Sequence, residues 1–110
     1  MITSLPELKE HLRVVGNEED DVIASYAEAV EDQLSNWLGR PVYKNVDDLP
    51  ALDDPAYTAT QIVAPRAFIV CVMQLVTRIY EDRGGEGGGV DDAVPPASVR
   101  AMLSGYRVFT

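Results

Sequence analysis

The pattern of apolar and polar positions is clearest in residues 65–83, the most apolar continuous part of the chain. Apolar side chains recur there every three or four residues, which is the spacing of one face of an α-helix. A face this wide predicts a central helix covered from several sides, with Phe68, Val72 and Ile79 in the core. Its two adjacent stripes are Phe68, Val72, Leu75 and Ile79, and Ile69, Met73, Val76 and Tyr80.

A second long helix is predicted over residues 18–38, where apolar side chains recur at every fourth position. We expect Asn17 to cap its start, the acidic residues 18–21 to face the positive end of its dipole, and Gly39 to end it. Its expected apolar stripe is Val22, Tyr26, Val30, Leu34 and Leu38, widened by Ile23, Ala27 and Trp37. Its expected solvent side holds Glu28, Glu31 and Asp32.

Two short helices complete the predicted elements. Ser4 and Glu7 have capping-box spacing, which predicts a helix over residues 5–14 that ends at Gly16. Pro96 suits the start of another over residues 96–104, and Gly105 suits its end. The fold class is therefore predicted as all-α: a small bundle of two long antiparallel helices with short N- and C-terminal helices and two long loops, in a single domain over residues 1–110.

The two predicted loops differ in composition. Residues 40–64 include Val42 and Tyr43, expected to be briefly extended, and Leu49 and Leu52, which either fix the loop to the domain or meet a neighbour. A loop of this length is often functional. Residues 84–95 are rich in glycine but follow a helix and lack the lysine of a phosphate-binding loop, so they are interpreted as a flexible linker.

The C-terminal tail, residues 106–110, is unusually apolar and aromatic for a chain end. It either folds back on the core or docks on another subunit. Because aromatic residues and arginine are enriched at interface anchors, we expect docking. The tail residues assigned to this contact are Tyr106, Arg107, Val108 and Phe109.

Charge and chemistry narrow the function classes. The 110 residues carry a net charge of −9, which opposes binding to nucleic-acid phosphates and to anionic lipid. The paired aspartates of residues 40–64 lack a nucleophile or histidine base beside them, so we predict no enzyme, no metal site and no cofactor.

Cys71 is expected to be a small buried hydrophobe, and His11 to face solvent. Residues 67–73 are too short an apolar run for a membrane span of about 20 residues, and no signal-peptide pattern is present, so we expect the cytoplasm.

The order of these elements carries a family resemblance. The relevant segments are the capped leucine helix followed by Gly16 and Asn17, then Trp37-Leu38-Gly39-Arg40-Pro41, Ile79-Tyr80-Glu81-Asp82-Arg83, Pro95-Pro96, and Gly105-Tyr106-Arg107-Val108. In this order they resemble the small α-helical head–tail connector proteins of tailed bacteriophages and prophages, over nearly the whole chain. The polyglycine of residues 84–89 departs from that pattern and leaves the length of the final linker open.

The resemblance implies a structural adaptor in the virion neck, assembled in the host cytoplasm. It implies a ring of about a dozen copies that binds the portal protein and a tail-side or stopper protein, with DNA passing through the lumen. Closing such a ring takes two different complementary surfaces, for which we nominate Tyr43 with the 40–64 loop, and the outer face of the 18–38 helix. The nominated lumen residues are Asp47, Asp48, Asp53, Asp54, Asp91 and Asp92. The alternative is an acidic helical binding protein, an antirepressor or DNA mimic, that acts on a basic partner.

Overall fold

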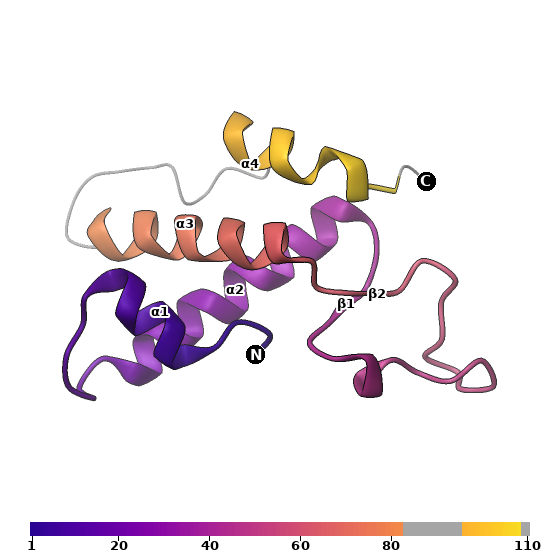
Figure 1. The fold of residues 1–110 in the computed structure, drawn as a ribbon, viewed down its shortest axis with the longest axis horizontal. Coiled ribbons are helices and arrows are strands. Elements are labelled where there is room, and N and C mark those ends of the chain that lie inside the picture. The colour runs from indigo at the N-terminus through magenta and orange to yellow at the C-terminus, as the bar shows by residue number, and fades with distance from the viewer. Residues whose placement is uncertain (83–95, 109–110) are drawn as a thin grey trace.

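The computed structural model describes residues 1–82 and 96–108, which are mostly helical. Four α-helices and a pair of two-residue strands account for most of this part (Figure 1). In chain order they are α1 Leu5–Leu12, α2 Asp20–Leu38, β1 Val42–Tyr43, β2 Ile62–Val63, α3 Arg66–Asp82 and α4 Ala97–Leu103. Short 3₁₀ turns lie at Val46–Asp48 and Ser104–Tyr106. All four predicted helices are present, and the predicted linker lies outside the described residues.

The helices are layered around α3. It contacts α1, α2 and α4, and its contact with α2 is the most extensive between any two of the described elements. Figure 1 shows α4 on one side of α3 and α1 with α2 on the other. In the same view α2 and α3 run in opposite senses and cross obliquely. This arrangement explains the wide apolar face of α3, because three helices cover it.

The fold departs from the all-α prediction in one respect. β1 and β2 pair in parallel, with Val42 opposite Ile62 and Tyr43 opposite Val63. The brief extension of residues 42–43 is confirmed, but the pairing with a strand that begins about 20 residues later was not predicted. The pairing brings both ends of the 40–64 segment together. The residues between the strands therefore form a loop that leaves the helices and returns to them, called the excursion below.

The core follows the predicted stripes closely. Phe68, Val72 and Cys71 of α3 have no solvent exposure, and Ile79 is half-buried at the edge of the core. Val22, predicted in the apolar stripe of α2, is 40% exposed and does not belong to the core. The other fully or nearly fully buried side chains come from all four helices: Leu8, Ile23, Ala27, Val30, Leu34, Leu38, Met73, Val76, Val99 and Leu103.

The ends of the first two helices differ from the sequence prediction. α1 ends at Leu12, two residues before the predicted end, because Arg13 takes the left-handed conformation, with φ of 60°, while Gly16 lies beyond it in the turn. Asn17 does not cap α2: Glu19 holds the cap position, and the Asn17 side chain accepts a hydrogen bond from Lys9 at 3.0 Å. The Ser4 cap of α1 is confirmed, since its hydroxyl accepts from the Glu7 amide.

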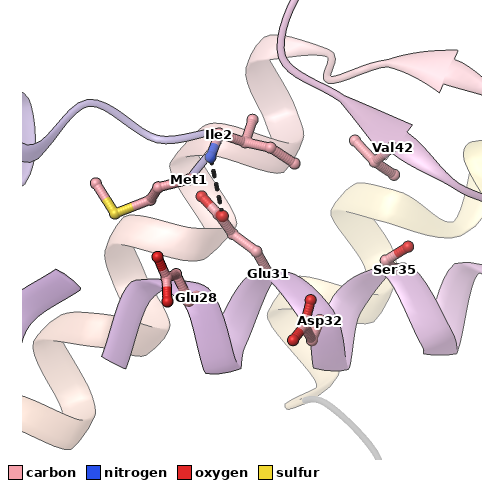
Figure 2. A pocket seen from close by; sticks show the side chains of 7 residues that line it. All are labelled: Met1, Ile2, Glu28, Glu31, Asp32, Ser35 and Val42. Atoms are coloured by element: carbon pink, nitrogen blue, oxygen red, sulfur yellow. Dashed lines mark hydrogen bonds between the residues drawn. The ribbon is translucent and has the colours of Figure 1, made fainter. Parts of the chain in front are cut away.

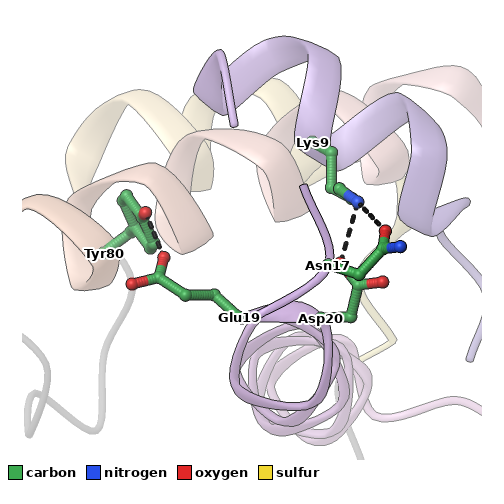
Figure 3. Close-up of polar contacts among 5 residues, drawn as sticks. All are labelled: Lys9, Asn17, Glu19, Asp20 and Tyr80. Atoms are coloured by element: carbon green, nitrogen blue, oxygen red, sulfur yellow. Dashed lines mark hydrogen bonds and ion pairs between the residues drawn. The ribbon is translucent and has the colours of Figure 1, made fainter. Parts of the chain in front are cut away.

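The acidic start of α2 is tied to both neighbouring helices by its side chains (Figure 3). The Lys9 ammonium lies 2.9 Å from an Asp20 carboxylate oxygen, which joins α1 to α2. The Tyr80 hydroxyl donates to the Glu19 carboxylate, which joins α3 to α2. These acids therefore form specific contacts with neighbouring helices in addition to lying at the positive end of the helix dipole.

Glu31 contradicts the expectation that it faces solvent. It is only 6% exposed, and its two carboxylate oxygens accept hydrogen bonds from the Ile2 amide at 3.0 Å and the Thr3 amide at 2.6 Å (Figure 2). The N-terminal segment crosses α2 at this point and covers the carboxylate. Glu31 thus anchors the segment that leads into α1.

Candidate docking surfaces

The excursion between the strands, residues 44–61, carries the most exposed apolar side chains near one end of the molecule. It extends away from the helices at the lower right of Figure 1. Leu52 is 81% exposed and Val46 71% exposed, and Tyr57 is exposed as well. Three exposed large apolar side chains on one segment make it a candidate for an interaction site.

The residues nominated from the sequence in this region differ in how far they are exposed to solvent. Tyr43 lies half-buried in β1, and Leu49 is half-buried where the excursion turns back. Leu52 does not fix the loop to the domain, since most of its side chain faces solvent. Val46 and Tyr57 were not nominated from the sequence. What could have identified them is that each is a large apolar residue in a segment rich in aspartate, asparagine and proline.

Hydrogen bonds within the excursion hold its shape. Asp48 accepts from the Asn45 amide at 3.1 Å, and Asp54 accepts from the Ala56 amide at 2.8 Å. The Gln61 side chain donates to the Pro50 carbonyl at 3.0 Å, across the base of the excursion. Two of the aspartates therefore shape turns, and the apolar side chains are presented on a preformed segment, residues 44–61, which we call the arm.

The tail folds back onto the C-terminal end of α2. The Arg107 guanidinium donates to the Trp37 carbonyl at 2.9 Å and lies 4.5 Å from the centre of the Trp37 ring. The Val108 amide donates to the Leu38 carbonyl at 2.7 Å. Arg107 and Val108 are half-buried by these contacts, Tyr106 is 38% exposed, and Phe109 lies outside the described residues. The Tyr106 carbonyl accepts from Arg40 at 3.1 Å, so the three nominated tail residues that the structure describes all make hydrogen bonds within their own subunit.

Gly39 makes this tail position possible. It ends α2 in the left-handed conformation, with φ of 72°, as predicted. A Cβ atom at Gly39 would lie 2.7 Å from the Val108 carbonyl oxygen, so any other residue would push the tail away. One glycine therefore serves both the helix end and the tail contact.

Side chains that could bind a metal ion do not cluster in the described part of the chain. No cluster of three or more His, Cys, Asp or Glu side chains there could hold a metal ion. Cys71 is buried, which raises the pKa of its thiol, and His11 is exposed as expected. Among the described helices, none has the length and apolar character that crossing a bilayer requires.

Comparison with known families identifies the family of this chain. The family model of phage gp6-like head-tail connector proteins matches residues 2–107, from the N-terminal segment to the tail. The chain belongs to this family. No curated protein and no solved structure matches it. The connector family is a structural one in the bacteriophage virion, which accords with the predicted non-enzymatic role.

Proposed function

We propose that the connector assembles as a ring below the portal, joins the tail side of the neck and lets DNA pass through its lumen. It forms in the host cytoplasm and remains in the virion neck. The observation that carries this proposal is the family match over residues 2–107, combined with an arm that presents Leu52 and Val46 to solvent. Exposed apolar side chains on a preformed arm suit a partner protein, because their burial on docking is favourable.

The arm and the tail are the docking elements that we assign to the portal and the tail-side or stopper protein. Tyr43 in β1 supports the arm at its base, Leu49 is half-buried within the arm, and Leu52 makes the main contact with the partner. At the tail, Tyr106 makes the main contact with the partner, and Arg107 and Val108 hold the tail against α2. The lumen is acidic in this proposal, because repulsion between aspartates and phosphates favours passage over binding. Asp47 and Asp53 are exposed candidates, while Asp91 and Asp92 lie outside the described residues.

Electron microscopy of the purified connector, alone and mixed with portal rings, tests the proposal. A ring on the portal is expected for the wild type, and loss of that ring is expected for Leu52→Ser. Val15→Ser is the matched control, because Val15 is 95% exposed in the α1–α2 turn, away from the arm. Equal ring formation by both variants would refute the role of the arm. A one-to-one complex with a basic regulator, and no ring, would favour the acidic binding protein instead.

A further inference from the structure

Charge is divided unevenly between the two sides of α3. Residues 1–64 hold thirteen acidic and four basic residues, whereas residues 65–82 and 96–108 hold two acidic residues and four arginines. α1 and α2 lie on one side of α3 and α4 on the other (Figure 1). The α1–α2 side is therefore acidic, since α2 holds five acidic residues and no basic one, and α4 on the other side holds Arg100 and no acid. Arg66 and Arg107 are engaged on the α1–α2 side, by Glu7 and by Trp37.

The acidic side contains a depression between the N-terminal segment, α2 and β1 (Figure 2). Its volume is about 320 Å³, and Ile2 and Val42 contribute half-buried apolar surface to it. Glu28 and Asp32, one turn apart on α2, are exposed at its edge. Neither carboxylate pairs with a cation within residues 1–82 and 96–108. The depression thus combines apolar surface with two uncompensated negative charges.

The opposite side presents a matching group on α4. Arg100 is exposed, and the described residues offer it no ion pair. Residues 96–108 contain no aspartate or glutamate, so no acid of its own helix competes for it. Arg78 on α3 is also exposed, but Glu81 lies three positions later on the same helix, within reach to offset its charge.

We propose that Arg100 of one connector subunit docks in the depression of the next, between Glu28 and Asp32. This contact rests on the proposed ring and names a pair of surfaces that closes it. The guanidinium can bind two carboxylates, and the aliphatic part of the side chain can cover Ile2 and Val42. Two different faces meet, as a ring requires. A direct match between the arm and the outer face of α2 would oppose acids to acids, so the structure favours α4 as the partner of α2.

Charge exchange between two variants tests this contact. Arg100→Glu, and Glu28→Lys with Asp32→Lys, should each weaken assembly roughly tenfold or more, because like charges then meet at every contact. Mixed in equal amounts, the two variants should regain assembly, since alternating subunits restore an opposite pair at each contact. Sedimentation with and without portal rings measures all three samples. All substituted residues are exposed, and thermal melting confirms folding. Arg100→Gln replaces Arg100→Glu if that variant unfolds.

The controls separate this contact from the ring itself. Arg78→Glu makes the same charge change on α3 and should alter assembly less than threefold, as expected of a solvated charge. A chain carrying both Glu28→Cys and Arg100→Cys should form a ladder of covalent multimers with a thiol-reactive cross-linker that spans the length of the lost arginine side chain, since a direct disulfide is too short for this contact. If wild-type rings form and Arg100→Glu assembles equally well, only the contact is refuted. If Arg100→Glu changes DNA retention and leaves assembly intact, the contact is likewise refuted. If the wild type forms no ring with or without the portal, the proposed function fails as well.

Discussion

Replacing Glu31 with alanine tests the most specific tertiary contact in the structure. The change removes both acceptors of the Ile2 and Thr3 amides, and the Thr3 residue is 1% exposed, so water cannot replace the lost carboxylate there. Hydrogen bonds to a charged group contribute about 1.5–3 kcal/mol, and a buried donor left unpaired costs about 1–3 kcal/mol. Since Ile2 is only half-buried, we expect a total loss of about 2–4 kcal/mol.

The assay is urea and thermal unfolding followed by circular dichroism. A loss of this size should lower the midpoint temperature by about 8–16 °C for a domain of this length. Asp32→Ala is the control, because its side chain is the exposed neighbour on the same helix. Glu31→Gln should fall between the two, since it keeps one acceptor. If Glu31→Ala and Asp32→Ala unfold within about 0.5 kcal/mol of each other, the carboxylate does not anchor the N-terminal segment.

Three further outcomes are expected. Phe68→Ala should cost about 3–5 kcal/mol in urea unfolding, because the ring is fully buried, and a cost below about 1 kcal/mol would show that this part of the core is misplaced. Truncation after Gly105 should lower stability by about 1–2 kcal/mol, because it removes the Arg107 contact with Trp37 and the Val108 hydrogen bond; a truncated protein that melts like the wild type would show that the tail is not held in solution. It should also fail to attach to portal-bearing heads, which a head-binding assay checks. The purified connector should not shift duplex DNA in a gel at physiological salt, since its net charge is −9, and a salt-sensitive shift at micromolar protein would contradict an acidic lumen.

The sequence predicted what local periodicity and capping determine. The four helices lie where the apolar spacing and the Ser4 and Gly39 signals put them, because those preferences act within one or two turns. Glu31 was misjudged because its spacing on the helix is that of a solvated residue, and only the return of the N-terminal segment buries it. Arg13 ends α1 although arginine has no preference for positive φ, so no residue pattern marked that end.

The candidate surfaces were likewise predictable where they depend on local sequence and unpredictable where they depend on contacts between distant residues. Leu52 was nominated from its place in a long loop, and the structure exposes it. The strand pairing that shapes the arm depends on contacts between distant residues, which apolar spacing does not reveal. Folding back on the core was the alternative that we did not favour for the tail, and Arg107 and Val108 do fold back, because the end of α2 offers them carbonyl groups and the Trp37 ring. The intermolecular role of these residues stays a prediction.

Arg40 gives the arm and the tail a common support. Its guanidinium donates to the Thr60 carbonyl at 2.6 Å, where the arm returns to β2, and to the Tyr106 carbonyl at 3.1 Å, at the start of the tail. Coupling free energies between two sites are reciprocal. A partner that displaces Thr60 on binding the arm therefore weakens the hold on the tail to the same extent that release of the tail favours that partner. Through this one side chain, the position of the arm where it returns to β2 and the position of the tail where it begins depend on each other.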